Sequence, residues 1–221
     1  MKKYSYIVVA FAVLVFGILF VPKIVDGFKN DTIVQNDRLN KSAEKELLTI
    51  GRAPEFSFTN QDNETITNDF YDGKVYLVEF FFTSCPTICP IMNENMVKLQ
   101  NTFKFENNFG IASFTIDPTN DTPEELKSHA KSLGVVNPNW QFLTNTQEEI
   151  FALVKNFNLY AAQNDDVPGG FEHSGYFALI DKKGNIRCRK DNSGNPILYY
   201  DGTEQEGVEM LKEDIKILLA E

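Results

Sequence analysis

The segment that most constrains the fold is an apolar run, residues 74–82, which leads into Cys85 and Cys89. The run contains Val, Tyr, Leu and three Phe residues, a composition typical of a central strand buried on both faces. A helical spacing of apolar residues follows at 91–105. Because the i, i+4 spacing brings both sulfurs to one side of a first helical turn, the thiols can share a soft metal ion or form a disulfide. The sequence leaves both chemistries open.

Strand-like and helix-like segments alternate along the rest of the chain. We expect hairpins at 56–67 and 175–190, strands at 110–116 and 140–143, and helices at 122–134, 146–157 and 206–219. This order predicts an α/β, thioredoxin-like fold with a central mixed β-sheet flanked by helices and an N-terminal β-hairpin. Right-handed crossovers then place the end of the strand at 74–82 at the centre of the sheet, where ligand sites form.

The N-terminus predicts one transmembrane helix. Residues 4–22 carry no charge, and as a helix they would rise about 28 Å, close to a bilayer core of roughly 30 Å. Because Lys2 and Lys3 precede this run, we expect residues 1–3 in the cytoplasm and the rest of the chain on the periplasmic (extracytoplasmic) side of the inner cell membrane. A cleaved signal peptide is the alternative, but no small-x-small cleavage site follows.

Two further regions complete the predicted organisation. Residues 23–50 are polar and mixed in charge, which indicates a tether, and residues 51–221 suit one folded domain. The net charge of −10 argues against a nucleic-acid partner, which would require a basic face.

The two histidines are the candidates for a third metal ligand. His173 follows the turn-rich loop 165–170 and precedes a strand, so it could reach the cysteine turn, whereas His129 is expected on an exposed helix face. Cys188 is expected to be a small buried strand residue. Two thiolates with one imidazole select copper, chiefly Cu(I), whereas structural zinc would normally require a fourth protein ligand.

A thiol at the start of a helix ionises more easily, because the helix dipole and free N–H groups favour the thiolate. Pro86 is expected in that first helical turn, where a missing N–H costs nothing.

The chain resembles the Sco/SenC proteins over residues 50–220. The resemblance lies in Phe82-Thr-Ser-Cys85-Pro-Thr-Ile-Cys89-Pro, in Thr115-Ile-Asp117-Pro-Thr-Asn-Asp121 and in Glu172-His173-Ser. It implies that Cys85, Cys89 and His173 bind Cu(I) or Cu(II), and that Asp117 is an acidic residue near the metal. Two positions depart from the family pattern: Glu172 replaces the usual Asp, and Asn120 replaces an Arg or His.

The same resemblance implies copper delivery to the Cu(A) site of cytochrome c oxidase subunit II, by a metallochaperone rather than an enzyme. Other copper chaperones or thiol-disulfide proteins are further candidate partners. The alternative is a thiol-disulfide oxidoreductase that reduces the Cu(A)-site cysteines with Cys85 and Cys89. A thiol peroxidase is more remote, because it needs an activating arginine and none lies near Cys85 in the sequence.

Overall fold

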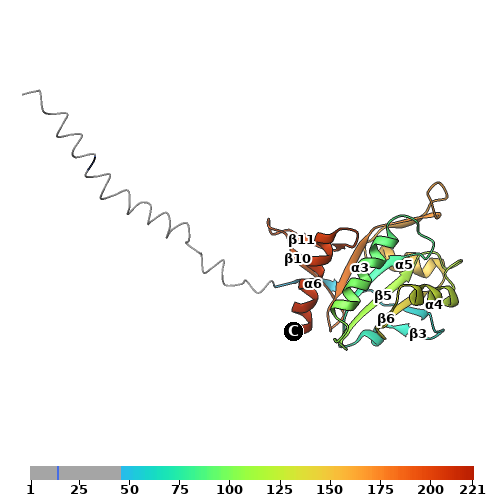
Figure 1. The fold of residues 1–221 in the computed structure, drawn as a ribbon, viewed down its shortest axis with the longest axis horizontal. Coiled ribbons are helices and arrows are strands. Elements are labelled where there is room, and N and C mark those ends of the chain that lie inside the picture. Colours follow the sequence, from blue (N-terminus) through green and yellow to red (C-terminus); the bar gives the residue numbers. More distant parts are fainter. Residues whose placement is uncertain (1–13, 15–45) are drawn as a thin grey trace, which may run out of the picture. The chain divides into compact units, whose positions relative to one another are not determined.

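The computed structural model describes Leu14 and residues 46–221, of which Leu47–Glu221 form one folded unit (Figure 1). Apart from Leu14, the predicted anchor at 4–22 lies outside the described residues, as does most of the predicted tether. Within the part of the chain that is described, no helix has the length and apolar character needed to cross a membrane.

The folded unit is built on one mixed sheet, with strands in the order β1-β10-β9-β4-β5-β6-β2-β3. β4, β5 and β6 are parallel neighbours, whereas β9 runs antiparallel to β4. β11 pairs with β10 and β12 pairs with β9. The strands are β1 (Leu48–Arg52), β2 (Ser57–Asn60), β3 (Thr65–Thr67), β4 (Val75–Phe81), β5 (Phe109–Thr115), β6 (Trp140–Thr144), β9 (Tyr176–Ile180), β10 (Asn185–Lys190), β11 (Pro196–Ile197) and β12 (Tyr200–Asp201). The predicted mixed sheet is confirmed, with the strand that precedes the cysteines at its centre.

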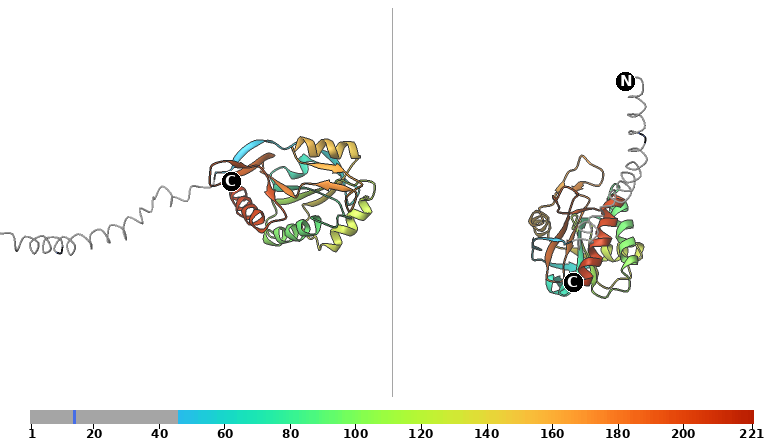
Figure 2. Two further views of the ribbon diagram at one scale, coloured as in Figure 1. Left: turned by 90° about the horizontal axis from the view of Figure 1, so that it is seen from above. Right: turned by 90° about the vertical axis from the view of Figure 1, so that its left-hand side faces the viewer.

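Helices cover both faces of this sheet. They are α3 (Cys89–Thr102), α4 (Pro123–Ser132), α5 (Gln147–Asn156) and α6 (Gln205–Ala220), with the 3-10 turn η1 (Asn68–Tyr71) between β3 and β4. Figure 2 shows α5 on one side of the sheet and α3, α4 and α6 on the other. At these two predicted helix starts, the side chains of Thr122 and Thr146 accept hydrogen bonds from backbone N–H groups of the first turns of α4 and α5.

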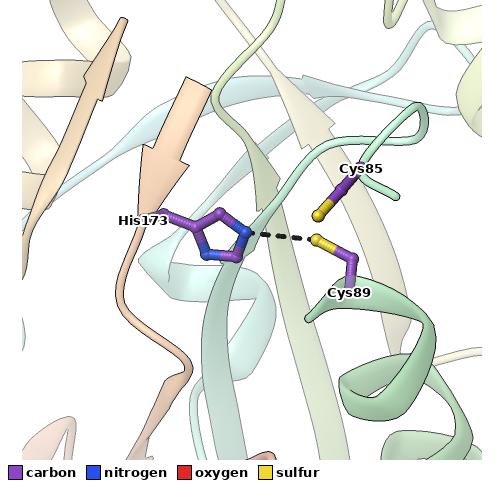
Figure 3. Close-up of side chains that lie close together, drawn as sticks. All are labelled: Cys85, Cys89 and His173. Carbon is purple, nitrogen blue, oxygen red and sulfur yellow. Dashed lines mark hydrogen bonds between the residues drawn. The ribbon is translucent and has the colours of Figure 1, made fainter. Parts of the chain in front are cut away.

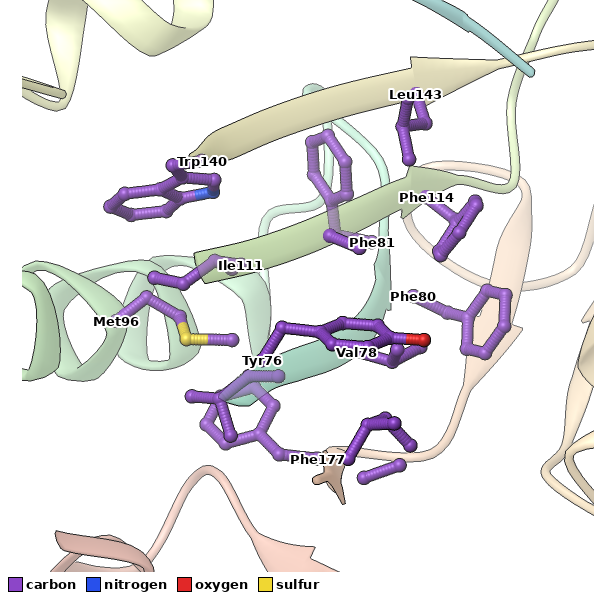
Figure 4. Close-up of a cluster of buried hydrophobic side chains, with 14 of the residues drawn as sticks. Tyr76, Val78, Phe80, Phe81, Met96, Ile111, Phe114, Trp140, Leu143 and Phe177 are labelled. Atoms are coloured by element: carbon purple, nitrogen blue, oxygen red, sulfur yellow. The ribbon is translucent and has the colours of Figure 1, made fainter. Parts of the chain in front are cut away.

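Aromatic side chains fill the core on both faces of the sheet (Figure 4). Successive residues of a strand point to opposite faces. Phe80 of β4 therefore packs against Phe157 beside α5, with ring centroids 5.9 Å apart. Phe81 points to the other face, where it stacks on His129 of α4 at 5.6 Å. Both faces of the central strand β4 are thus buried, as its composition predicts.

Two elements differ from the sequence-based expectation. β1 lies partly within residues 23–50, which were expected to be tether; it is an edge strand that is mostly exposed, so it has no strong apolar pattern. A separate two-stranded sheet, β7 (Ala161–Gln163) and β8 (Phe171–His173), occupies the region expected to be a loop before the strand at 176. Strands of three residues are too short to show a period in the sequence.

Candidate metal centre

The two cysteines lie where the central strand gives way to a helix. We call residues 82–88 the cysteine loop; it connects β4 to α3. Cys85 lies in this loop and its backbone N–H donates to the Phe82 carbonyl oxygen at 3.2 Å. Cys89 is the first residue of α3, so the helix begins at the second cysteine and Pro90, rather than the expected Pro86, occupies its first turn. Only one of the two thiols is therefore part of the helix.

A buried aspartate fastens the cysteine loop to the neighbouring strand. The Asp121 carboxylate, which is fully buried, accepts hydrogen bonds from the Thr83 backbone N–H at 3.1 Å and from the hydroxyls of Thr83 and Thr115. Burial raises the pKa of Asp121, and these hydrogen bonds oppose that rise. The clamp joins the ends of β4 and β5 and so fixes the start of the loop. Sequence reasoning gave Asp121 no such role, although hydroxyls at the ends of two adjacent strands are a signal that could have indicated it.

Three potential ligand atoms meet at this point. The sulfurs of Cys85 and Cys89 and a ring nitrogen of His173 all lie within 4.8 Å of one another, as Figure 3 shows. The sulfur of Cys89 is 3.2 Å from His173 Nε2. The structure thus brings together the three residues that the sequence analysis selected as ligands.

The imidazole tautomer follows from its hydrogen bonds. His173 Nδ1 lies 3.1 Å from the Ser174 carbonyl oxygen. A carbonyl only accepts, so Nδ1 carries the proton and a neutral ring leaves the lone pair of Nε2 directed at the sulfurs. A metal ion at this point would meet that lone pair and the two sulfurs.

The two thiols are poised differently. Cys85 and Cys89 are 7% and 2% exposed. Hydrogen bonding, chiefly from Cys89, lowers the pKa of Cys85 to about 3 against the opposing effect of burial. The interaction with Cys85, followed by burial, raises the pKa of Cys89. Of the two sulfurs, that of Cys85 is therefore the more easily ionised.

His173 is carried by a hairpin rather than by a loop. We call residues 161–173 the histidine hairpin; His173 is the last residue of β8 and is partly buried. Glu172 accepts hydrogen bonds from the Tyr160 hydroxyl at 3.1 Å and from Asn164 Nδ2 at 3.0 Å, which ties the two strands together. The expectation of a histidine on a turn-rich loop is therefore corrected to a histidine at a strand end.

The tip of the histidine hairpin lies against the cysteine loop. Gly169 has φ +91°, and a Cβ at this position would stand 2.8 Å from the Phe82 ring and 3.2 Å from Pro86. The Phe82 ring also contacts the ring of His173, with centroids 5.9 Å apart. Close approach here requires glycine, since any side chain would push the hairpin away.

The remaining candidate residues have other surroundings. Asp117 is buried and its carboxylate accepts from Asn120 Nδ2 at 2.7 Å, so it caps the turn after β5 and lies outside the group of three ligands. The expectation of an exposed His129 is wrong, because its ring is packed between Phe81 and Phe142 and burial lowers its pKa. Cys188 is fully buried on β10, as predicted.

The fold and the site together define a class of protein. It is a thioredoxin-like domain in which two cysteines follow the central strand and a histidine from a separate hairpin lies beside them. The family model for SCO1/SenC matches residues 45–205. The SCO1 protein homolog of Bacillus subtilis (strain 168) is 38% identical over 153 residues, which cover 66% of this chain and 76% of the relative. The chain belongs to the SCO1/SenC family.

Solved structures share the fold. BsSco, described as a member of the Sco family of cytochrome c oxidase assembly proteins with a disulfide switch, is 30% identical with a TM-score of 0.64, covering 77% of this chain and 95% of that one. Copper-bound ScoI of Arabidopsis thaliana is 21% identical with a TM-score of 0.61, covering 76% of this chain and 99% of the other. At 21% identity the second likeness shows the fold alone.

Proposed function

We propose that this protein binds copper with Cys85, Cys89 and His173 and delivers it to the Cu(A) site of cytochrome c oxidase subunit II. The observation that carries the proposal is the meeting of two sulfurs and one imidazole nitrogen within 4.8 Å. Soft sulfur ligands with one imidazole suit copper, whereas magnesium and calcium prefer oxygen ligands. The oxidase as recipient rests on family membership and on the description of BsSco.

The protonation states of Cys85, Cys89 and His173 favour the binding of copper. Cys85 is already a thiolate, because its pKa is lowered to about 3, and His173 offers the Nε2 lone pair. One proton, that of Cys89, must leave as the third ligand forms its bond. Copper affinity should therefore fall as the pH is lowered, since protons compete for the sulfurs and the ring nitrogen.

We further propose that residues 4–22 anchor the domain in the inner cell membrane, with residues 1–3 in the cytoplasm and residues 23–46 as the tether. The copper-binding unit would then lie on the extracytoplasmic side, where an oxidase in the same membrane could meet it. The uncharged run at 4–22 and the preceding Lys2 and Lys3 support this arrangement.

Anaerobic titration of the reduced protein with Cu(I), in competition with a chelator, tests the proposal. We expect one copper per wild-type chain and a clear loss of affinity in His173→Ala. His129→Ala is the matched control, because His129 lies on α4 away from the three ligand atoms, and it should bind like wild type. A stoichiometry near zero, with free thiols confirmed, would contradict copper binding.

A second candidate function uses the same two cysteines as a thiol-disulfide oxidoreductase. The lowered pKa of Cys85 beside a second thiol favours it, because a thiolate is the attacking species in disulfide exchange. Reductase activity does not need His173 as a ligand, so a His173→Ala chain that keeps full biological activity would favour this function over copper delivery. A thiol peroxidase is less well supported, since Arg187 and Arg189 are paired with Asp181 and Asp214 and Arg52 lies opposite Asn185 on β10.

A further inference from the structure

A cavity of about 530 Å³ lies at the end of the sheet where β4 begins. Small-molecule sites typically enclose about 300–1,000 Å³. Tyr76, the second residue of β4, lines this cavity, whereas the cysteine loop begins six residues later at Phe82. At about 3.3 Å per residue, the cavity and the candidate metal centre are roughly 20 Å apart along the strand. None of the described residues that line the cavity belongs to the cysteine loop or the histidine hairpin.

Segments that are far apart in the sequence form the walls of this cavity. The Ala53 N–H, just after β1, donates to the Gly184 carbonyl oxygen at 2.9 Å. The Gly73 N–H, just after η1, donates to the Lys182 carbonyl oxygen at 3.1 Å. The chain beyond β1 and the chain beyond η1 are therefore both fastened to the turn between β9 and β10, so the backbone of the fold holds the cavity open.

Buried aromatic rings form an apolar part of the lining. Phe56, Tyr71 and Tyr76 all line the cavity, and the rings of Tyr71 and Tyr76 stack with their centroids 4.3 Å apart. The Tyr71 hydroxyl is satisfied within the protein, because it donates to the Ile111 carbonyl oxygen at 2.8 Å. Tyr71 therefore offers a ligand only its ring.

The Tyr76 hydroxyl, in contrast, is a donor without an acceptor. Tyr76 is only 2% exposed, yet its hydroxyl donates to none of the side chains or backbone groups that the structure describes. Burial raises the pKa of Tyr76, and Asn68 opposes the rise, which is the effect of a group that donates to the phenol oxygen. The hydroxyl therefore keeps its hydrogen at neutral pH. Because a buried donor without an acceptor costs stability, an acceptor atom in the cavity would remove that cost.

Charged side chains of both signs line the same cavity. The guanidinium group of Arg52 lies beside Gly184, with Nη2 3.5 Å from the position of a Cβ on that glycine. Glu55, Asp69 and Asp72 also line the cavity, and in the described part of the chain Arg52 forms no ion pair with any of these acids. The charges of Arg52 and Asp72 both act on the buried hydroxyl. Exposed charges without partners are common, so it is the orphaned hydroxyl among them that indicates a ligand.

We propose that this cavity binds a small zwitterion of the α-amino acid class. The carboxylate of the ligand binds the Arg52 guanidinium and accepts the hydrogen of the Tyr76 hydroxyl. The ammonium group binds the carboxylates of Asp69 and Asp72, and the side chain of the ligand packs on the aromatic rings of the lining. Binding therefore joins the end of β1 to η1 and the turn that follows it.

Ligands of a single charge fit this arrangement less well. A carboxylic acid without an amine satisfies Arg52 and the Tyr76 hydroxyl, but the neighbouring aspartates repel it. An amine without a carboxylate satisfies the aspartates, but Arg52 repels it and the hydroxyl keeps no acceptor. Only a molecule that carries both charges pairs the two sides at once, because a guanidinium matches a carboxylate and an ammonium group only donates.

Equilibrium dialysis of the full-length protein against each of the twenty common amino acids tests the proposal. We expect at least one of them to bind with a Kd below about 1 mM. The decarboxylated amine and the deaminated acid of that amino acid should each bind about tenfold more weakly or worse, since each leaves one side of the cavity unpaired. No retention of any of the twenty at millimolar concentration would overturn the proposal. Equal binding of the amino acid and of either analogue would overturn it as well.

Single substitutions place the ligand in this cavity. Arg52→Gln and Asp72→Asn should each weaken binding about tenfold or more, and Tyr76→Phe, which keeps the ring and removes only the hydroxyl, about fivefold. Lys190→Gln and Glu124→Gln make the same changes of charge at exposed positions outside the cavity and should stay within twofold of wild type. Equal losses in the controls, or wild-type affinity in all three cavity variants, would overturn the proposal. Copper stoichiometry should be unchanged in every variant, which separates this site from the candidate metal centre.

Discussion

The two halves of the candidate metal centre are built in different ways. The cysteine loop is continuous with the central strand of the main sheet and is fastened by the buried Asp121. The histidine hairpin is a separate two-stranded sheet whose residues are mostly exposed or only partly buried. The sulfurs thus belong to the rigid core, whereas the imidazole is carried by an element with fewer buried contacts. Such a division would suit the proposed function, in which the site holds copper and then releases it.

The largest effect should come from removing the clamp on the cysteine loop. Asp121→Ala leaves the hydroxyls of Thr83 and Thr115 without their acceptor in a buried place. We expect a loss of about 2–4 kcal/mol in the free energy of unfolding, measured by denaturant titration, together with weaker copper binding. Asp166→Ala, an exposed position of the histidine hairpin, is the control and should change stability by less than about 0.5 kcal/mol. Equal losses of stability in the two variants would show that the cysteine loop and the histidine hairpin are held equally firmly.

The next prediction concerns how the free energy of unfolding depends on pH through Glu79, which is buried in the central strand. The fully buried Glu79 of β4 has a pKa of about 7 in the folded state, compared with an ordinary value of 4.5, so it takes up a proton on folding at pH values between these two. This group therefore stabilises the fold fully below about pH 4.5, and that contribution is lost as the pH rises through 7. Glu79→Gln should raise the free energy of unfolding at pH 8 by up to about 3 kcal/mol. Thermal unfolding of both proteins at pH 4 and pH 8 checks this, and an equal gain at both pH values would contradict it.

A pair of neighbouring glycines tests how the histidine hairpin is seated. Gly169 and Gly170 both have positive φ, so alanine strains the backbone at either position, but only a Cβ at Gly169 meets Phe82. Gly169→Ala should displace the hairpin and weaken Cu(I) affinity about tenfold, a loss of about 1.4 kcal/mol. Gly170→Ala should stay within twofold of wild type. Competition with a chelator measures the Cu(I) affinity of both variants. Equal affinities would show that the contact between Gly169 and Phe82 does not position the hairpin.

The smallest effect is expected at the third cysteine. Cys188 is fully buried on β10, and burial raises the pKa of its thiol, so it is neither accessible nor a good nucleophile. Cys188→Ala should leave the copper stoichiometry and the rate of thiol oxidation unchanged. A lower copper stoichiometry, measured by the same Cu(I) titration, would show that this residue takes part in binding.

Local patterns predicted the architecture, and they selected three side chains that the structure brings together. The apolar central strand, the cysteine spacing and the capping threonines at 122 and 146 act over a few residues, so the sequence shows them directly. The histidine hairpin, the Asp121 clamp and the hydrogen bond between Ser113 and Glu79 depend on contacts across the fold. Glu79 pairs with Ser113, 34 positions away, and nothing local distinguishes it from a residue that simply interrupts an apolar run. The polar neighbours of His129 predicted an exposed position, whereas its ring in fact stacks on Phe81 of the sheet.

X-ray absorption spectroscopy of the copper-loaded, reduced protein tests the central claim most directly. Cys85, Cys89 and His173 predict two sulfur scatterers and one nitrogen scatterer in wild type, and loss of the imidazole signal in His173→Ala. The same spectrum from both proteins would show that the histidine hairpin does not supply a ligand and would contradict the account.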